Sequence, residues 1–243
     1  MTYRDSTFTY ILDENCSIEV DLDPKVFRPT GTSEILIESV LEFLTKPGKL
    51  LDLGCGSGLV GLAIYKGGKV QDKLYASDLS NEAVNLLKKN AVKNEVLFDV
   101  RQGSIYEPWS GQKFDYIIDD ISGVAKQVAS ISSWFSKTSC EAGIDGTSLV
   151  NLAIKGAPKH LNKRGLFFFP VLSLSNSKKI IEVAKSVFNN VEKINSKTWA
   201  LPDDMKDNLN ILLDLKKEGH VNFDEKFGLI LWSTDIYVAY NPK

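Results

Sequence analysis

Four glycines lie within eight residues of the sequence, directly after a short apolar stretch. This segment is the first candidate for a ligand-binding site. The stretch runs from Leu50 to Leu53, and the glycines follow at positions 54, 56, 58 and 61. Glycine permits tight backbone turns and lets a ligand approach the main chain closely. A helix that begins at such a turn directs unpaired N–H groups and a partial positive charge toward it. A strand, a glycine-rich turn and a helix in this order indicate a nucleotide site.

Acidic residues at the ends of predicted strands are the second set of candidates. Asp78 ends a strand predicted at 73–77, at the distance beyond the glycines (roughly 20 residues) where a carboxylate accepts hydrogen bonds from ribose hydroxyls. The alternative is that Asp78 caps the next helix. Asp119 and Asp120 end a strand predicted at 114–120, which places them at the ligand crevice of a parallel sheet. We assign Asp120 to the site and regard Asp119 as a turn or cap residue.

The glycine spacing fits two kinds of nucleotide. Gly56-x-Gly58-x-x-Gly61 matches the pattern of NAD-binding folds. The strand ends at Leu53, however, so the turn begins at Gly54 and the NAD register would start two residues late. The order Asp52-x-Gly54-x-Gly56-x-Gly58 resembles motif I of the methyltransferases that use S-adenosyl-L-methionine (SAM). That resemblance implies that Asp52 lies near the cationic methionyl amine of SAM.

The elements that must position these residues alternate between strands and helices along the chain. Such alternation predicts an α/β fold, a Rossmann-like sheet of seven mostly parallel strands with helices on both faces. An alternating segment at 7–22 predicts an additional N-terminal β-hairpin. Thr32 or Ser33 is expected to cap the following helix, after a loop that is either a flap over the cofactor or a cap on the sheet. Three phenylalanines at 167–169 are expected in the core.

Composition excludes several classes of protein. The chain has 243 residues, 43% of them hydrophobic and 25% charged, and this suits one large α/β domain. A net charge of −2 gives no general indication of nucleic-acid binding, although a local patch remains possible. Apolar runs are too short to span a membrane, and the first residues lack a signal core. Three scattered cysteines and two distant histidines predict reduced thiols, a cytoplasmic location and no metal site.

Together these features resemble class I SAM-dependent methyltransferases, and most closely the branch of release-factor glutamine N5-methyltransferases and small-domain RNA methyltransferases. The resemblance rests on the segment 28–38, on the glycine motif with Asp78, and on the segment 141–146 with the helix that follows. It implies residues 1–46 as a hairpin and lead-in helix, and 47–243 as a methyltransferase domain with an inserted helix near 199–228. That insertion is either a substrate lid or padding on the sheet edge.

The same resemblance implies SAM as the cofactor and a set of cofactor-binding residues. In many methyltransferases an aspartate at the Ser104 position meets the adenine amine, so here that contact would be weaker or made by the backbone. The implied set is Thr30, Asp52, Gly54, Cys55, Gly56, Gly58, Asp78, Leu79, Ser104, Ile105 and Asp120.

The chain departs from the branch at its Asn-Pro-Pro-Tyr motif, where it reads Asp120-Ile121-Ser122-Gly123. A carboxylate accepts hydrogen bonds but cannot donate them as an asparagine amide does, and the missing prolines remove a fixed φ. A glutamine amide is therefore in doubt as the acceptor, and an amine or hydroxyl is as plausible.

We therefore expect an enzyme that moves a methyl group from SAM to an N or O nucleophile on a protein or small molecule. Asp120 is the candidate catalytic residue, because it could orient the nucleophile or accept its proton. The alternatives are an NAD-dependent oxidoreductase and a SAM-binding protein without catalysis.

Overall fold

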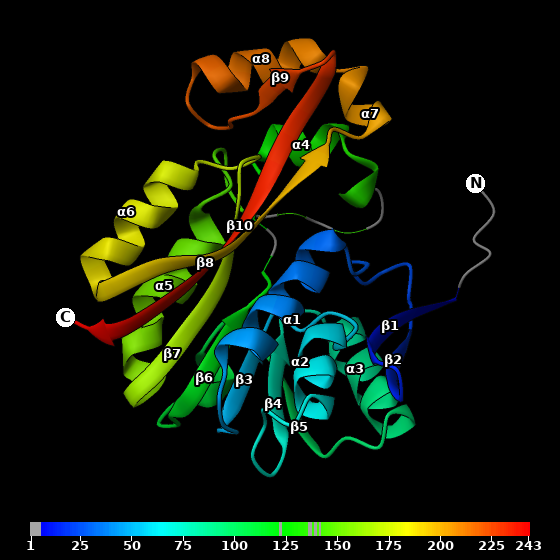
Figure 1. Cartoon of the computed structure of the whole chain (residues 1–243), viewed down its shortest axis with the longest axis vertical. Helices are drawn as coiled ribbons and strands as arrows, with labels where there is room; N and C mark the ends of the chain where they lie inside the picture. Colours follow the sequence, from blue (N-terminus) through cyan, green and yellow to red (C-terminus); the bar gives the residue numbers. More distant parts are fainter. Residues whose placement is uncertain (1–5, 122, 136–137, 139, 141) are drawn as a thin grey trace.

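A single twisted sheet runs through the centre of the molecule (Figure 1). The computed structural model describes residues 6–121, 123–135, 138, 140 and 142–243. The order across the sheet is β5-β4-β3-β6-β7-β10-β8, with β9 paired to β10. Strands β5, β4, β3, β6 and β7 are parallel, whereas β10 is antiparallel to both β7 and β8. The strands are β3 (Leu50–Leu53), β4 (Leu74–Asp78), β5 (Phe98–Gln102), β6 (Phe114–Asp119), β7 (Leu161–Leu172), β8 (Phe188–Ala200), β9 (Asp224–Lys226) and β10 (Leu229–Pro242).

Helices cover both faces of the sheet, as predicted. One face carries α1 (Gly31–Phe43), α2 (Leu59–Lys66) and α3 (Asn81–Lys93), and the other carries α5 (Ser148–His160) and α6 (Ser177–Val187) (Figure 1). The three phenylalanines of β7 are fully buried and alternate between the two faces, because successive side chains of a strand point to opposite sides. The predicted Rossmann-like architecture and the predicted core role of these rings are both confirmed.

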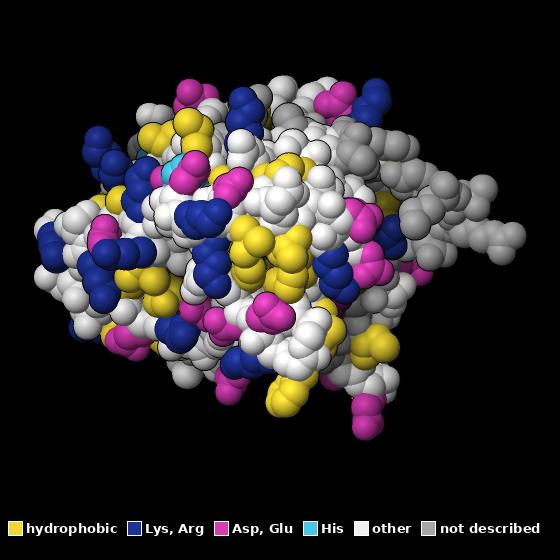
Figure 2. Space-filling model, turned by 90° about the horizontal axis from the view of Figure 1, so that it is seen from above, with side chains coloured by type: hydrophobic (Ala, Val, Ile, Leu, Met, Phe, Trp, Pro, Cys, Tyr) yellow, Lys and Arg dark blue, Asp and Glu magenta, His cyan; other side chains and the backbone are white. Residues whose placement is uncertain are grey.

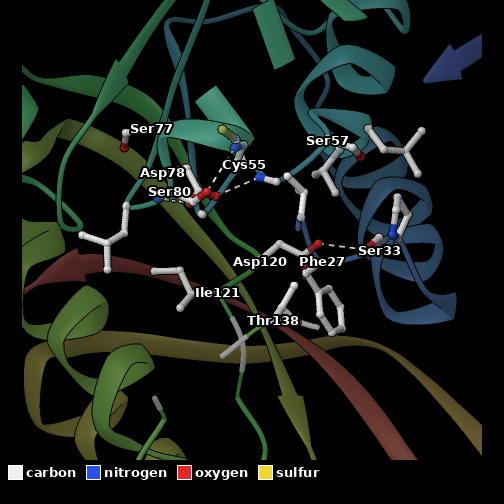
Figure 3. Close-up of a pocket in the computed structure, with 18 of the residues that line it drawn as sticks. Phe27, Ser33, Cys55, Ser57, Ser77, Asp78, Ser80, Asp120, Ile121 and Thr138 are labelled. Atoms are coloured by element: carbon white, nitrogen blue, oxygen red, sulfur yellow. Dashed lines mark hydrogen bonds between the residues drawn. The ribbon is translucent and has the colours of Figure 1, made fainter. Parts of the chain in front are cut away.

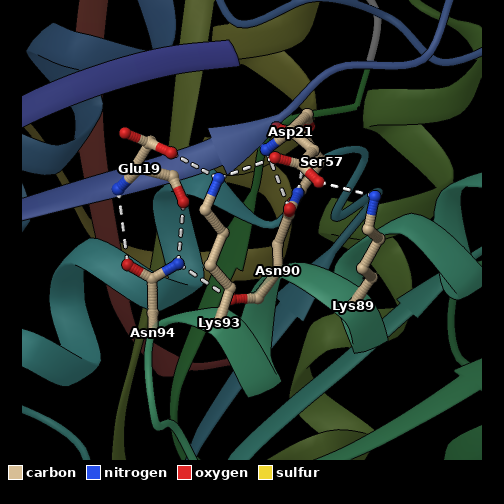
Figure 4. A network of polar contacts seen from close by, with 7 residues as sticks. All are labelled: Glu19, Asp21, Ser57, Lys89, Asn90, Lys93 and Asn94. Atoms are coloured by element: carbon tan, nitrogen blue, oxygen red, sulfur yellow. Dashed lines mark hydrogen bonds and ion pairs between the residues drawn. The ribbon is translucent and has the colours of Figure 1, made fainter. Parts of the chain in front are cut away.

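The predicted N-terminal hairpin is also present, as β1 (Thr7–Asp13) and β2 (Cys16–Asp21). It forms a separate two-stranded sheet beside α2 and α3. Ile18 and Val20 of β2 are fully buried in the same hydrophobic cluster as α1, α2 and α3. Polar contacts join the hairpin to α3 as well (Figure 4). The boundary between a lead-in region and a methyltransferase domain at residue 46 stays a prediction.

The start of α1 differs from the sequence expectation. The cap of α1 is Thr30, whose hydroxyl accepts a hydrogen bond from the backbone N–H of Thr32 at 3.3 Å. Thr32 and Ser33 lie inside the first turn, so neither can cap it. Asn176 caps α6, and the hydroxyl of the preceding Ser175 donates to the carbonyl of Leu172.

The segment expected to be an insertion at 199–228 is organised differently. Trp199 and Ala200 still belong to β8 and pair with β10, so the insertion begins at Leu201. The expected single helix is two, α7 (Asp203–Lys206) and α8 (Leu209–Lys217), separated at Asp207 and Asn208. These helices share a hydrophobic cluster with α4 (Lys126–Ile131), which sequence analysis missed.

The insertion stands at one end of the molecule (Figure 1). From that side, apolar side chains gather near the middle of the face and charged side chains of both signs surround them (Figure 2). Short 3-10 helices at Glu107–Trp109 and Ser133–Phe135 complete the described elements. A search of the residues described found no helix with the length and apolar character needed to cross a membrane.

Candidate active site

A cavity of about 490 Å³ lies where β3, β4 and β6 end (Figure 3). Its wall combines the glycine turn after β3, the acidic end of β4 and the loop after β5. It also includes the loop before α1, represented by Phe27 and Pro29. The structure brings most of the predicted cofactor residues to this one wall. They are Gly54, Cys55, Gly56, Asp78, Leu79, Ser104, Ile105 and Asp120.

The glycine turn has the backbone shape that its sequence suggests. Gly54, Gly56 and Gly58 have φ values of +69°, +51° and +88°, in the left-handed region that side chains disfavour. The N–H groups of Gly54 and Cys55 donate to the carbonyl of Ser77 at 2.9 and 3.1 Å. The turn is therefore held against the end of β4.

Asp78 lines the cavity and also holds the turn. Its Oδ2 accepts from the N–H of Gly56 at 3.0 Å, and its Oδ1 accepts from the N–H of Ser80 at 2.9 Å. Burial raises the pKa of Asp78, although these backbone hydrogen bonds oppose that shift. Each carboxylate oxygen can still accept a further hydrogen bond, so the geometry leaves room for the predicted ribose contact.

Asp52 does not line the cavity, contrary to the expectation of a direct cofactor contact. It is fully buried behind the turn, where Oδ2 accepts from the N–H of Gly61 at 3.1 Å and Oδ1 has no partner. Burial and the neighbouring charge of Asp120 raise the pKa of Asp52 well above its usual value. Through its hydrogen bond with Gly61, the Asp52 side chain links the start of α2 to β3. Gly58 is likewise outside the wall, because it is the residue that precedes α2.

The adjacent acids at the end of β6 have different surroundings. Asp119 is buried, its Oδ1 accepts from the N–H of Ile121 at 3.0 Å, and its Oδ2 has no partner. Burial raises the pKa of Asp119 to about 8. Asp120 is half-buried at the cavity wall, and its Oδ2 accepts from the hydroxyl of Ser33 at 2.8 Å (Figure 3). Burial raises the pKa of Asp120 to about 6, against the effect of that hydrogen bond.

A second cavity of about 250 Å³ adjoins the first, and sequence analysis did not anticipate it. The two cavities share four lining residues: Phe27, Ser33, Asp120 and Ile121. Thr30, predicted as a cofactor residue, lines this second cavity instead. Much of the remaining wall is aromatic and comes from distant segments, with side chains from Trp134, Phe135, Trp199 and Trp232. Asp120 therefore lies at the junction of a large cavity and a smaller one.

The loop after β5 lines the cavity where a contact with adenine is expected, and that contact stays a prediction. The backbone N–H of Ser104 is already used, since it donates to Oε2 of Glu107 at 3.1 Å. Leu79, which is 66% exposed, also lines this cavity. Of the motif residues, Ser122 and Glu141 lie outside the described residues.

Comparisons with known proteins agree with this geometry. The methyltransferase small domain matches residues 25–120. A release factor glutamine methyltransferase from Geobacter sulfurreducens is 26% identical over 64% of this chain and 57% of its own length. A putative protein N5-glutamine methyltransferase from Methanocaldococcus jannaschii is 27% identical over 72% of this chain and 86% of its own length. The match thus spans little more than half of the first of these relatives.

Solved structures support the same fold. A ribosomal protein L11 methylase from Lactobacillus delbrueckii subsp. bulgaricus superposes with a TM-score of 0.58 at 16% identity, covering 96% of this chain and 99% of the other. A T. thermophilus 16S rRNA N2 methyltransferase, in complex with AdoMet and guanosine, gives a TM-score of 0.61 at 14% identity, covering 97% and 50%.

The sheet order, the glycine turn and the acid at the end of β4 are those of the class I SAM-dependent methyltransferase fold. More specifically, the chain carries a methyltransferase small domain and is a distant homologue of release factor glutamine methyltransferases and L11 methyltransferases. Two of the similar solved structures contain AdoMet or SAH, and the comparisons favour SAM over the NAD alternative.

Proposed function

We propose that this protein transfers the methyl group of SAM to an N or O nucleophile, with SAM in the larger cavity and the acceptor in the smaller one. The observation that carries the proposal is the junction at Asp120, where the two cavities share their wall. A methyl transfer needs two ligands that meet at one point, and the described cavities offer that arrangement.

The residues of the larger cavity fit SAM. When bound, SAM supplies an electrophilic methyl group on a cationic sulfur. The bare backbone at Gly54 and Gly56 allows close approach of the methionyl part, and Asp78 offers acceptor lone pairs to the ribose. The carboxyl groups of Asp78 and Asp120 line this cavity, and in their ionised forms they favour a cationic ligand.

Asp120 is our candidate for the residue that binds and activates the methyl acceptor. Ser33 occupies one lone pair of Oδ2, which fixes the carboxylate and leaves Oδ1 for the acceptor. In its ionised form, Asp120 can orient a nucleophile or take its proton. Most of the acceleration would come from holding the nucleophile about 3–3.5 Å from the methyl carbon with its lone pair aligned.

A protein is the first acceptor class that we propose, and a small molecule is the second. The relatives are named for methylation of a release factor or of ribosomal protein L11, both of them proteins. Asp120 stands where the glutamine-methylating branch carries asparagine. This replacement supports an amine or hydroxyl nucleophile over a glutamine amide.

Calorimetric titration with SAM, S-adenosylhomocysteine, NAD and NADH tests the cofactor assignment. We expect SAM and S-adenosylhomocysteine to bind saturably, and Asp78→Ala to weaken both by at least tenfold. Asp224→Ala, an exposed acid on β9, is the matched control and should change nothing. Binding of NAD alone would overturn the assignment.

A radiolabelled-methyl screen of cell extracts then tests catalysis. Label should appear in a protein or a small metabolite, and Asp120→Asn should abolish its transfer. SAM binding without labelling of any extract component would instead indicate a SAM-binding protein without catalysis.

A further inference from the structure

Aromatic rings that contact one another form much of the wall of the smaller cavity. We call this cluster of Phe27, Trp134, Phe135, Trp199 and Trp232 the aromatic box. The indole of Trp232 lies 5.4 Å from that of Trp134 and 6.1 Å from that of Trp199, measured between ring centroids. Phe27 and Phe135 form a second pair at 5.0 Å. Faces of such rings carry negative electrostatic potential and attract cations, most strongly for tryptophan. The box can therefore hold a positively charged group.

The charge of the same wall has one sign. Among its described lining residues, Asp120 is the only side chain that ionises, and lysine, arginine and histidine are absent from that set. The ammonium of Lys197 lies 4.6 Å from the ring centroid of Trp199, but Lys197 does not line the cavity. An anionic acceptor would find no countercharge among these described lining residues.

We propose, building on the methyl transfer proposed above, that the acceptor is an aliphatic amine that enters the smaller cavity as an ammonium group. The aromatic wall lies against the cation, and the carboxylate of Asp120 forms its ion pair at the junction with the larger cavity. A glutamine amide fits less well, because its carbonyl oxygen would need a donor where Asp120 offers only acceptors. A nucleobase could stack on the rings, but it would leave Asp120 without a positive partner.

The transfer balances with these groups alone. The ammonium first gives one proton to Asp120, which restores the nitrogen lone pair. That lone pair forms the new N–CH₃ bond while the S–CH₃ bond breaks and its electron pair stays on sulfur, giving neutral S-adenosylhomocysteine and a methylated ammonium. The proton on Asp120 then passes to water. Ser33 keeps its hydrogen bond to Oδ2 throughout, so Oδ1 is the oxygen that takes the proton.

One further polar group bears on the choice of acceptor. The Nε1–H of Trp232 is buried and has no hydrogen-bond partner among the described residues. It could serve a water molecule or an oxygen of the substrate. If the acceptor were an amide, its carbonyl oxygen would accept from this N–H. An ammonium group would instead bind through the indole ring and would not need the N–H.

Calorimetry on the full chain saturated with S-adenosylhomocysteine tests the proposal. The probes are Nα-acetyl-lysine methylamide and putrescine as amines, Nα,Nε-diacetyl-lysine methylamide as the neutral control, Nα-acetyl-glutamine methylamide as the amide, and guanosine as the base. We expect the amines to bind at least tenfold more tightly than the three neutral probes. Tighter binding of the amide or of guanosine would overturn the proposal.

Variants separate the charge from the rings. Asp120→Asn should weaken amine binding at least tenfold, and the accompanying loss of affinity for neutral S-adenosylhomocysteine should be clearly smaller. Trp134→Leu and Trp199→Leu should weaken amine binding about three- to tenfold. Trp232→Phe keeps a ring but removes the N–H, so it should weaken amine binding less than Trp134→Leu does; a loss as large as that of Asp120→Asn would indicate an amide anchor and contradict us. Phe227→Leu, at a fully exposed ring, is the matched control.

The failures are distinguishable. Absence of S-adenosylhomocysteine binding would refute the proposed function itself, whereas its binding without amine binding would refute only this inference. Trp199 packs against Gly31, so the thermal melt and S-adenosylhomocysteine affinity of Trp199→Leu are measured first; if it does not fold, Asp120→Asn and Trp134→Leu carry the test. Labelled methyl transfer to a lysine peptide or to putrescine then distinguishes a protein side chain from a free polyamine.

Discussion

The hydroxyl of Ser33 donates to Oδ2 of Asp120 at 2.8 Å, although the two residues are 87 positions apart. This contact joins the first turn of α1 to the loop after β6, and both residues line both cavities. The position and the ionisation of Asp120 therefore depend on an element that precedes the glycine motif. The start of α1 therefore contributes directly to the candidate active site, through Ser33.

Removal of this hydrogen bond should change the pH dependence of methyl transfer. Burial raises the pKa of Asp120 to about 6, and the Ser33 hydroxyl opposes that rise. In Ser33→Ala the pKa should therefore rise further, by about one unit. The acidic limb of the pH–rate profile should shift to higher pH, while the rate at pH 9 should equal that of the parent protein.

The control for this variant is Ser39→Ala, which removes a buried hydroxyl from the same helix but at a distance from the cavity. The other acids next to Asp120 are Asp119 and Asp52, which are unchanged in both variants. Carbon-13 NMR of the Asp120 carboxyl provides the same test before an acceptor is known. An identical titration in Ser33→Ala and the parent protein would contradict the prediction.

Asp119 should make folding stability fall as pH rises. Its pKa is raised by burial to about 8, so between the unfolded value of 3.8 and about 8 the folded state holds a proton that the unfolded state has lost. The stabilising contribution is complete below the unfolded pKa and is lost as pH rises through the folded pKa. The slope is at most about 1.4 kcal/mol per pH unit.

Asp119→Asn removes this titration and keeps the acceptor for the N–H of Ile121. Urea unfolding at pH 5, 6.5 and 8 should show a smaller decline for the variant than for the parent protein. The added amide N–H lies where Oδ2 has no partner, so the variant is expected to be less stable at pH 5. Two parallel stability curves would show that Asp119 is ionised throughout.

Sequence alone predicted the parts of the site that are local in the chain. The glycine turn and Asp78 follow strands that a periodic apolar pattern reveals, and both reach the cavity wall. Asp52 illustrates the limit of that approach, because the same motif does not show that its side chain turns inward. Its partner is the N–H of Gly61, which sequence analysis considered only as part of an NAD pattern.

The aromatic box could not have been predicted in this way. Trp134, Trp199 and Trp232 come from a 3-10 helix and two antiparallel strands, and only the tertiary fold brings them together. Trp199 and Trp232 are directly paired across β8 and β10, but that register needs the exact strand ends. The sequence expectation placed Trp199 in an insertion and so missed the pair.

Gly61 should tolerate no side chain. A Cβ at this position would lie 2.7 Å from Oδ2 of Asp52 and 2.9 Å from the Leu74 side chain. Gly61→Ala should therefore weaken the bond that fastens α2 to β3 and destabilise the protein by about 1–3 kcal/mol. Gly123→Ala, whose Cβ would meet nothing closer than 3.8 Å, is the control for urea unfolding. Equal stability of the two variants would mean that the backbone at Gly61 adjusts freely.

Asn90 should be the main attachment of the hairpin to the cofactor site (Figure 4). Its fully buried amide accepts from the N–H of Asp21 at 2.8 Å and donates to the carbonyls of Asp21 and Ser57 at 3.1 and 2.8 Å. Asn90→Ala leaves these backbone groups unpaired, so we expect a loss of about 2–4 kcal/mol in the free energy of unfolding.

Because Ser57 lies in the glycine turn and lines the larger cavity, SAM affinity should fall in the same variant. Lys89→Ala is the matched control: it removes the ion pair of a 70% exposed lysine with Asp21 and should change stability by less than about 0.5 kcal/mol. Urea unfolding and SAM titration of both variants check the prediction. If Asn90→Ala lost stability but bound SAM normally, the hairpin would support the fold without shaping the glycine turn.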